Sequence, residues 1–76
     1  MKEILESMLK PLVDNKEAIS INQVDKDKIT VFEVRVAPED MGKVIGKEGK
    51  IAKAIRTILR AVGTKEHKKV TVEFMD

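Results

Sequence analysis

The residues best suited to chemistry in this chain form the loop Gly46-Lys47-Glu48-Gly49, which leads into a helix-forming segment at Lys50. Glycine permits positive φ angles and has no Cβ, so two glycines in a tight loop let a ligand approach the backbone closely. Backbone N–H groups at a helix start lack intrahelical partners and favour negative charge. We expect the N–H groups of Gly49, Lys50 and Ile51 to bind a phosphate, with the Lys47 and Lys50 side chains beside it.

The glycine spacing alone is weak support for a phosphate site. Because glycine makes up about 7% of residues, two glycines at this spacing occur by chance in roughly one chain in three of this length. Glu48 also opposes anion binding at close range. The alternative is an ordinary tight turn between two helices, so the surroundings of the loop must decide.

Positive charge is concentrated around the loop. Between Lys43 and Lys65, seven lysines and arginines accompany the single acid Glu48, giving a charge of +6 in a chain whose net charge is +2. The rest of the chain therefore carries a charge of −4. Such a distribution favours a face that binds a polyanion such as nucleic acid, although a solvated helix face would carry the same charges.

Composition excludes several classes of site. The absence of cysteine rules out disulfides, thiolate zinc sites and a cysteine nucleophile. Phe32 and Phe74 are the only aromatic residues, so an aromatic platform that stacks nucleobases is disfavoured. His67 lies in a polar run and is expected to be a solvated loop residue, and Glu39 and Asp40 suit a helix N-terminus better than acid–base catalysis. We expect no enzymatic activity, no metal site and no cofactor.

The chain carries no apolar run near the roughly 20 residues that a membrane-spanning helix needs. Met1-Lys2-Glu3 leads directly into an amphipathic pattern without a signal-peptide core. With 76 residues there is room for one hydrophobic core. We therefore expect a single domain over residues 1–76 and a cytoplasmic location.

Helix and strand signals alternate before the loop. Helical spacing of apolar residues predicts a helix over the first dozen residues that ends or kinks near Lys10, because Pro11 cannot continue its hydrogen bonding. Alternation predicts strands at about 18–24 and 29–36, joined by a charged turn as a hairpin. Within the second strand, Phe32, Val34 and Val36 are expected to share one face, with Glu33 and Arg35 on the other.

Two helices and a strand follow. Pro38 suits the first position of a short helix that reaches about Ile45, and a closing strand is expected at 70–74. The second helix has an apolar stripe with basic residues on the opposite side, and Gly63 is placed to cap its C-terminus. The stripe consists of Ile51, Ala54, Ile55, Ile58, Leu59 and Val62, and the basic residues are Lys50, Lys53, Arg56 and Arg60. The expected fold is α+β, with a three-stranded mixed sheet and three helices on one face.

The run of residues 44–55, with Pro38-Glu39-Asp40-Met41-Gly42-Lys43 before it, resembles the signature of a KH domain. The order helix, strand, strand, helix, helix, strand is similar to the type II version of that fold. The resemblance covers essentially the whole chain and is closest to the small bacterial single-KH RNA-binding family KhpA. It implies a groove that clamps about four nucleotides of single-stranded RNA, with the GxxG backbone against the phosphates.

The resemblance also implies roles for particular residues. The phosphate clamp would comprise Gly46, Lys47, Glu48, Gly49 and Lys50. The groove would be built or supported by Val44, Ile45, Ile51 and Ile55, with its strand edge from Val34, Arg35 and Val36. Apart from the resemblance, the distribution of charge predicts a basic face that comprises Lys43, Lys53, Arg56 and Arg60.

Members of the family that the chain resembles are described as RNA chaperones that dimerise and pair with a larger KH protein, KhpB, also called Jag or EloR. In some bacteria the pair is linked to cell-wall synthesis and cell elongation. Two functions thus stand side by side: an RNA-binding module acting with a second KH protein, or a protein-interaction adaptor that docks through its helix-GxxG-helix surface with RNA binding incidental.

Overall fold

The elements of the computed structural model, which describes residues 1–75, follow the predicted order of helix, strand, strand, helix, helix, strand. The helices and strands are α1 (Lys2–Leu9), β1 (Ser20–Lys26), β2 (Ile29–Arg35), α2 (Met41–Ile45), α3 (Lys50–Lys65) and β3 (Lys69–Phe74). Short 3₁₀ turns at Lys16–Ala18, Pro38–Asp40 and Lys47–Gly49 connect them.

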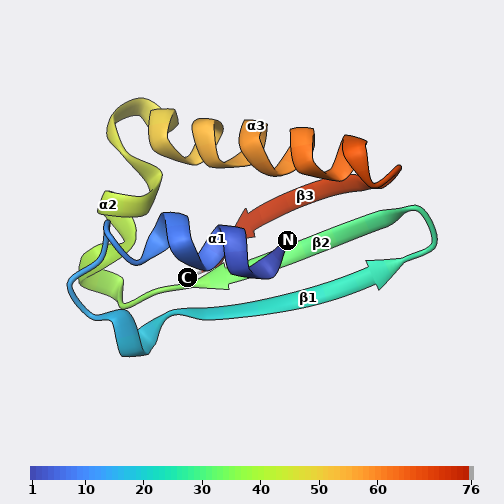
Figure 1. Ribbon diagram of the computed structural model, residues 1–76. Coiled ribbons are helices and arrows are strands. Elements are labelled where there is room, and N and C mark those ends of the chain that lie inside the picture. Colours follow the sequence, from blue (N-terminus) through green and yellow to red (C-terminus); the bar gives the residue numbers. More distant parts are fainter. Residues whose placement is uncertain (76) are drawn as a thin grey trace.

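The three strands form one mixed sheet in the order β1-β2-β3 (Figure 1). β1 and β2 pair antiparallel as the predicted hairpin, and Lys26 opposite Ile29 is the pair next to the turn. β3 returns through α2 and α3 and pairs parallel to β2. β2 is therefore hydrogen-bonded on both sides, whereas no strand within residues 1–75 pairs with the other edge of β3.

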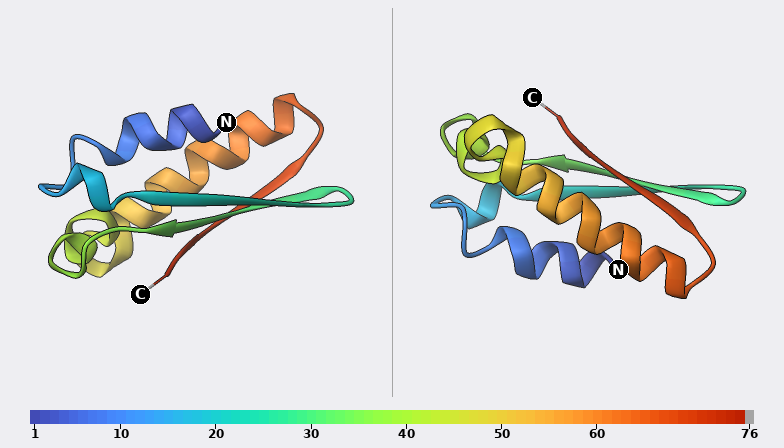
Figure 2. Two further views of the ribbon diagram at one scale, coloured as in Figure 1. Left: turned by 90° about the horizontal axis from the view of Figure 1, so that it is seen from below. Right: turned by 90° about the horizontal axis from the view of Figure 1, so that it is seen from above.

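The core lies between the sheet and the helices α1 and α3, which cover the same face of the sheet (Figure 2). α2 lies beyond the end of β2 and delivers the chain to α3 (Figure 1). The predicted alternation in β2 is confirmed, because Phe32 and Val34 are fully buried and Arg35 is exposed. The largest fully buried apolar side chains are Phe32, Leu5, Leu9, Leu59, Val34, Val44 and Val72.

The first helix and the hairpin differ only slightly from their predicted bounds. α1 ends at Leu9 with Lys10 as its C-terminal cap, directly before Pro11, as predicted. β1 begins and ends two residues later than expected, so the hairpin turn contains only Asp27 and Lys28. The pairing of Asp25 with Thr30, whose hydroxyl donates to the Asp25 carboxylate at 2.8 Å, extends the hairpin to this point.

The C-terminal end of α3 was predicted wrongly. The helix continues past Gly63 to Lys65, so Gly63 is a helical residue and not the cap. A Cβ on Gly63 would lie 2.5 Å from Val70 Cγ2 and 2.7 Å from the Lys68 carbonyl oxygen. Glycine is needed here because β3 packs directly against the helix.

Within residues 1–75, neither α3 nor any other helix is long and apolar enough to cross a membrane.

The buried face of α3 also differs from the predicted stripe. The buried residues are Ala52, Ile55, Leu59 and Gly63, while Ala54 and Ile58 are exposed. Successive residues of an α-helix are 100° apart around its axis. On this scale, the mean direction of the buried residues differs by roughly a fifth of a turn from the mean direction of the predicted apolar stripe. The rotation brings the half-buried Arg56 toward β3 and leaves Ile58 47% exposed on the other flank.

Candidate nucleic-acid interface

The loop between α2 and α3 is built around two glycines with different roles. Gly46 has φ 77° and ψ 176°, a conformation essentially restricted to glycine, and a Cβ there would lie 2.6 Å from Ile51 Cγ1. Gly49 has φ 73°, yet a Cβ there would meet nothing within 4 Å. The packing of the protein therefore requires a glycine at Gly46, whereas the absence of a Cβ at Gly49 leaves open space for a ligand.

The hydrogen bonds of the loop correct the expected phosphate donors. Gly49 N–H donates to the Gly46 carbonyl at 3.2 Å, and Lys50 N–H donates to the Lys47 carbonyl, because residues 47–49 form a 3₁₀ turn before α3. The backbone N–H groups of Lys47 and Glu48 have no acceptor within residues 1–75. The two residues between the glycines thus supply donors that were not predicted, and two of the three predicted donors, those of Gly49 and Lys50, are occupied.

Glu48 lies in the left-handed region of backbone space, with φ 58° and ψ 24°. Non-glycine residues adopt this region at a cost of roughly 1–2 kcal/mol. Its side chain and that of Lys47 are exposed, so one acid and one base extend into solvent from the turn. At this position the carboxylate of Glu48 opposes the binding of an anion to the turn.

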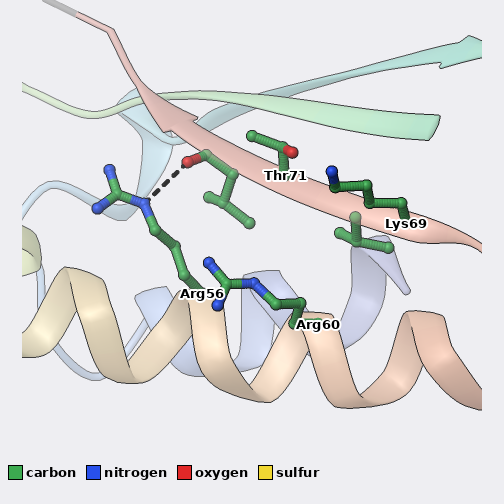
Figure 3. Close-up of a pocket in the computed structure, with 6 residues that line it drawn as sticks. Arg56, Arg60, Lys69 and Thr71 are labelled. Carbon is green, nitrogen blue, oxygen red and sulfur yellow. Dashed lines mark hydrogen bonds between the residues drawn. The ribbon is translucent and has the colours of Figure 1, made fainter.

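Four basic residues of α3 share one flank, which we call the α3 basic flank: Lys50, Lys53, Arg56 and Arg60. Lys50, Lys53 and Arg60 are exposed, and Arg56 is half-buried. Along with β3, Arg56 and Arg60 line a hollow of about 340 Å³ (Figure 3). The other lining residues are Lys69, Val70, Thr71 and Val72.

The strand beside this flank is β3, and the prediction that Val34, Arg35 and Val36 supply the strand edge was wrong. β2 is the central strand, so it has no free edge. Val34 is fully buried and Val36 nearly so, while Arg35 extends from the uncovered face of the sheet, where it lines a different hollow with Glu33 and Asn22. The composition of β3 does not identify it as the edge strand. Its connection to α3 does, because a strand joined to a helix by a short turn has to lie next to that helix.

The aliphatic residues predicted for the groove divide by burial. Val44 is fully buried and Ile55 is 4% exposed, so both belong to the core and hold the helices in place. Ile45 and Ile51 are half-buried and pack on the edge of that core, next to the loop. Only these two retain surface that a ligand could contact.

Lys43 does not join the α3 basic flank. Its ammonium group pairs with the Asp14 carboxylate and lies 3.4 Å from Asp40 Oδ1. The hydrogen bond to Asp14, assisted by Asp40, raises the pKa of Lys43 above its ordinary value. Because two carboxylates compensate this charge, Lys43 anchors the start of α2 and offers little attraction to an anion.

Asp40 is the buried partner in this cluster and has 0% exposure. Its Oδ2 accepts the backbone N–H of Asn15 at 2.9 Å. That hydrogen bond holds the pKa of Asp40 below its ordinary value, although burial acts in the opposite sense. Asp40 lies at the N-terminus of α2, as expected from the helix dipole, and its hydrogen bond also joins the segment after α1 to the start of α2. His67 is exposed in the turn before β3, as predicted.

The element order, the parallel return of β3 and the GxxG turn between two helices define a type II KH domain. The chain belongs to the KhpA/KhpB family of KH domains, whose family model matches residues 2–74.

Several named relatives align along nearly their whole length. The chain is 52% identical over 75 residues to the RNA-binding protein KhpA of Clostridium perfringens, covering 99% of this chain and 100% of the relative. It is 46% identical over 76 residues to the RNA-binding protein KhpA of Aquifex aeolicus, with 100% and 96% coverage. It is 40% identical over 74 residues to that of Borreliella burgdorferi, with 97% and 90% coverage. No solved structure matches the chain.

Proposed function

We propose that this protein binds single-stranded RNA along the α3 basic flank, with the loop at 46–49 against the phosphates. The observation that carries the proposal is the alignment of the loop, its free Lys47 and Glu48 N–H groups and the α3 basic flank along one side of α3. The open space at Gly49 gives a sugar–phosphate chain access to the loop backbone. Relatives named as RNA-binding proteins support the same function.

The proposed mode of binding does not use aromatic stacking. Phe32 is fully buried, and the ring of Phe74 lies under the Arg56 guanidinium at 5.6 Å. Contacts to RNA would instead come from charge, backbone donors and the aliphatic surface of Ile45 and Ile51. About four phosphate contacts predict weak binding, near 10⁻⁴ to 10⁻⁶ M at physiological salt.

The direct test is a double variant in which Lys47→Asp and Glu48→Asp place two acids at the clamp. We expect it to lose binding to a short unstructured RNA in fluorescence anisotropy while its melting curve stays close to that of the parent. Lys28→Asp, in the hairpin turn at the opposite end of the molecule from the loop, is the matched control and should bind normally (Figure 1). Unchanged binding by the double variant would show that the loop is not the clamp.

A salt titration tests the phosphate contacts separately. About four contacts on a single strand imply a slope near −3 in a plot of log affinity against log salt. A flat salt response would favour the adaptor function over the RNA-binding function.

A second surface supports the proposal that the protein works as one of a pair, through self-association or with a KhpB-like protein. Ile58 of α3 is 47% exposed and Ile4 of the neighbouring α1 is 41% exposed. Ile58 lies on the flank of α3 opposite the α3 basic flank, so a partner bound there leaves the proposed RNA surface free. Multivalency of this kind would raise a weak affinity to a useful one.

Sedimentation of the isolated protein, and of a mixture with a KhpB-like protein, tests this surface. Ile58→Glu should lower association in one of the two samples, and Ile29→Glu is the matched control because Ile29 is 40% exposed on the uncovered face of the sheet. Equal effects of both variants would contradict the assignment of this surface. RNA chaperoning, post-transcriptional regulation, a cytoplasmic location and a link to cell-wall synthesis or cell elongation stay predictions from the family resemblance.

A further inference from the structure

The helix α2 supports one end of the loop at 46–49, and it is too short to hold that position by itself (Figure 1). It has five residues, whereas an isolated helix needs roughly 12–15 residues to be even marginally stable in water. The helix at the other end of the loop, α3, has 16 residues. Contacts between α2 and the rest of the protein must therefore fix the direction of α2, and with it the direction of the loop.

Contacts of two kinds hold α2 in place. Toward its C-terminal end, Val44 is fully buried in the hydrophobic core. At its N-terminal end the contact is polar, because the fully buried Asp40 accepts the backbone N–H of Asn15 at 2.9 Å. Hydrophobic burial has no preferred direction, whereas a hydrogen bond weakens steeply when its angle changes. The carboxylate of Asp40 is therefore the contact that fixes the orientation of α2.

The carboxylate of Asp40 depends in turn on Lys43. Asp40 Oδ1 is buried and accepts no hydrogen bond of good geometry within residues 1–75, and the Lys43 ammonium group 3.4 Å away compensates its charge. A buried charge that loses its partner is strongly destabilising. Asp14, which also pairs with Lys43, is exposed, and exposed ion pairs contribute little. The pair of Asp40 and Lys43 thus holds the start of α2.

We propose that Asp40 and Lys43 are positioning residues for RNA binding, which orient the loop at 46–49 without contacting the RNA themselves. The inference rests on the proposed RNA binding, and it removes Lys43 from the residues that attract phosphates. A loop that leaves the core in another direction no longer aligns the free N–H groups of Lys47 and Glu48 with the α3 basic flank. RNA affinity should therefore depend on a carboxylate that is inaccessible to RNA.

Charge and positioning predict opposite effects of Asp40→Asn on RNA binding. If charge alone mattered, the loss of a carboxylate beside Lys43 would raise the affinity for RNA. Positioning predicts that the affinity falls by roughly three- to tenfold, because only a fraction of the molecules then holds the loop in its binding orientation. The slope of log affinity against log salt should stay that of the parent, since no phosphate contact is lost.

Glu39→Gln is the matched control for Asp40→Asn. It removes the same charge from the neighbouring residue, which is exposed, and it should not lower the affinity. Fluorescence anisotropy with a short unstructured RNA at several salt concentrations measures both the affinity and the slope for each variant.

Variants of Lys43 test the same pair if Asp40→Asn folds poorly. Lys43→Arg keeps a cation for Asp40 and should retain most of the RNA affinity. Lys43→Gln should lower the affinity with the salt slope unchanged, whereas the loss of a direct phosphate contact would make the slope shallower by about 0.7. Combining Lys43→Gln with Asp40→Asn should weaken binding by less than the sum of the two single effects, because both remove one pair.

Nuclear magnetic resonance separates loop orientation from overall stability. The amide chemical shifts and heteronuclear NOE values of Lys47 and Glu48 should change in Asp40→Asn and Lys43→Gln, and those of the buried Leu59 should stay at the parent values. In Glu39→Gln all three amides should match the parent. Loop amides that match the parent in both Asp40→Asn and Lys43→Gln would contradict the positioning role.

An RNA affinity of Asp40→Asn that equals or exceeds that of the parent would overturn this inference and leave RNA binding standing. A shallower salt slope in Lys43→Gln would also overturn it, because Lys43 would then be a phosphate contact. Failure of the parent protein to bind RNA would overturn the proposed function and this inference together.

Discussion

At the scale of single residues, the two loop glycines separate folding from ligand access. Gly46 combines a backbone conformation restricted to glycine with close packing on Ile51. Gly49 has a positive φ but no steric neighbour for a Cβ. The neighbouring Glu48 shows that the left-handed region is open to other residues in this turn. A substitution at Gly46 therefore tests the fold, and one at Gly49 tests the approach of a ligand.

Gly46→Ala should lower the free energy of unfolding by roughly 2 kcal/mol or more, because the new methyl group meets Ile51 and the backbone is strained. Gly49→Ala should cost about 1 kcal/mol, from backbone strain alone. Urea denaturation of both variants measures the difference. A smaller loss for Gly46→Ala than for Gly49→Ala would contradict the packing argument.

Glu48→Asn removes an acid from the clamp and suits the left-handed conformation, which asparagine adopts more readily than glutamate. Loss of one repulsive charge near a phosphate is worth at most about 1 kcal/mol in water, so RNA affinity should rise by up to about fivefold. Anisotropy at low salt measures it, with Glu17→Gln at an exposed site before β1 as the control. Equal gains in both variants would mean that only net charge matters.

At the scale of elements, the contact between α3 and β3 determines which residues of the helix are available. β3 packs so closely that Gly63 must lack a Cβ, and Arg56 reaches the Val72 carbonyl. The same contact leaves Ile58 in solvent on the other flank of the helix. One side of α3 thus carries the α3 basic flank and the hollow, and the other carries apolar surface.

Replacing the helical glycines Gly63 and Gly42 by alanine should change the stability of the fold in opposite directions. Gly63→Ala should destabilise the fold by roughly 1–3 kcal/mol, because its methyl group would overlap Val70 and the Lys68 carbonyl. Gly42→Ala should stabilise it by up to about 1 kcal/mol, since Gly42 is a helical residue of α2 with nothing within 4 Å of an added Cβ. Thermal denaturation of the two variants and the parent measures both changes in stability. A stabilising effect of Gly63→Ala would show that β3 does not hold this position.

At the scale of the whole molecule, Asp40 links parts of the chain that are far apart in sequence. Its Oδ2 accepts the N–H of Asn15, which lies 25 positions earlier, and Lys43 pairs with both Asp40 and Asp14. This cluster attaches the segment after α1 to the start of α2, and through α2 it fixes the direction in which the loop at 46–49 leaves the core.

Stability should depend on pH through Asp40. Its pKa is lowered in the folded state from an ordinary value of 3.8, so the stabilisation is complete above that value and is lost as the pH falls through the folded-state pKa. The parent should be more stable than Asp40→Asn at pH 7, and the difference should narrow below about pH 4. Urea denaturation between about pH 7 and pH 2.5 measures this. A difference that stays constant over that range would exclude the ionised carboxylate as its cause.

The sequence by itself determined the features that depend on neighbouring residues. The GxxG turn, the end of α1 before Pro11, the alternation of β2 and the order of the six elements each follow from local backbone preference or from the spacing of apolar residues. The class of domain could be inferred from that order and from the signature around the loop.

Only the tertiary structure decided which surfaces meet, because that depends on contacts between segments far apart in the chain. An amphipathic helix with apolar residues over a wide arc can bury several faces, and the position of β3 selected the one that leaves Ile58 exposed and turns Arg56 inward. Strand order is likewise non-local, so β3 supplies the free edge that had been expected from β2. The sequence therefore locates the loop, and the packing of α3 against β3 determines what lies beside it.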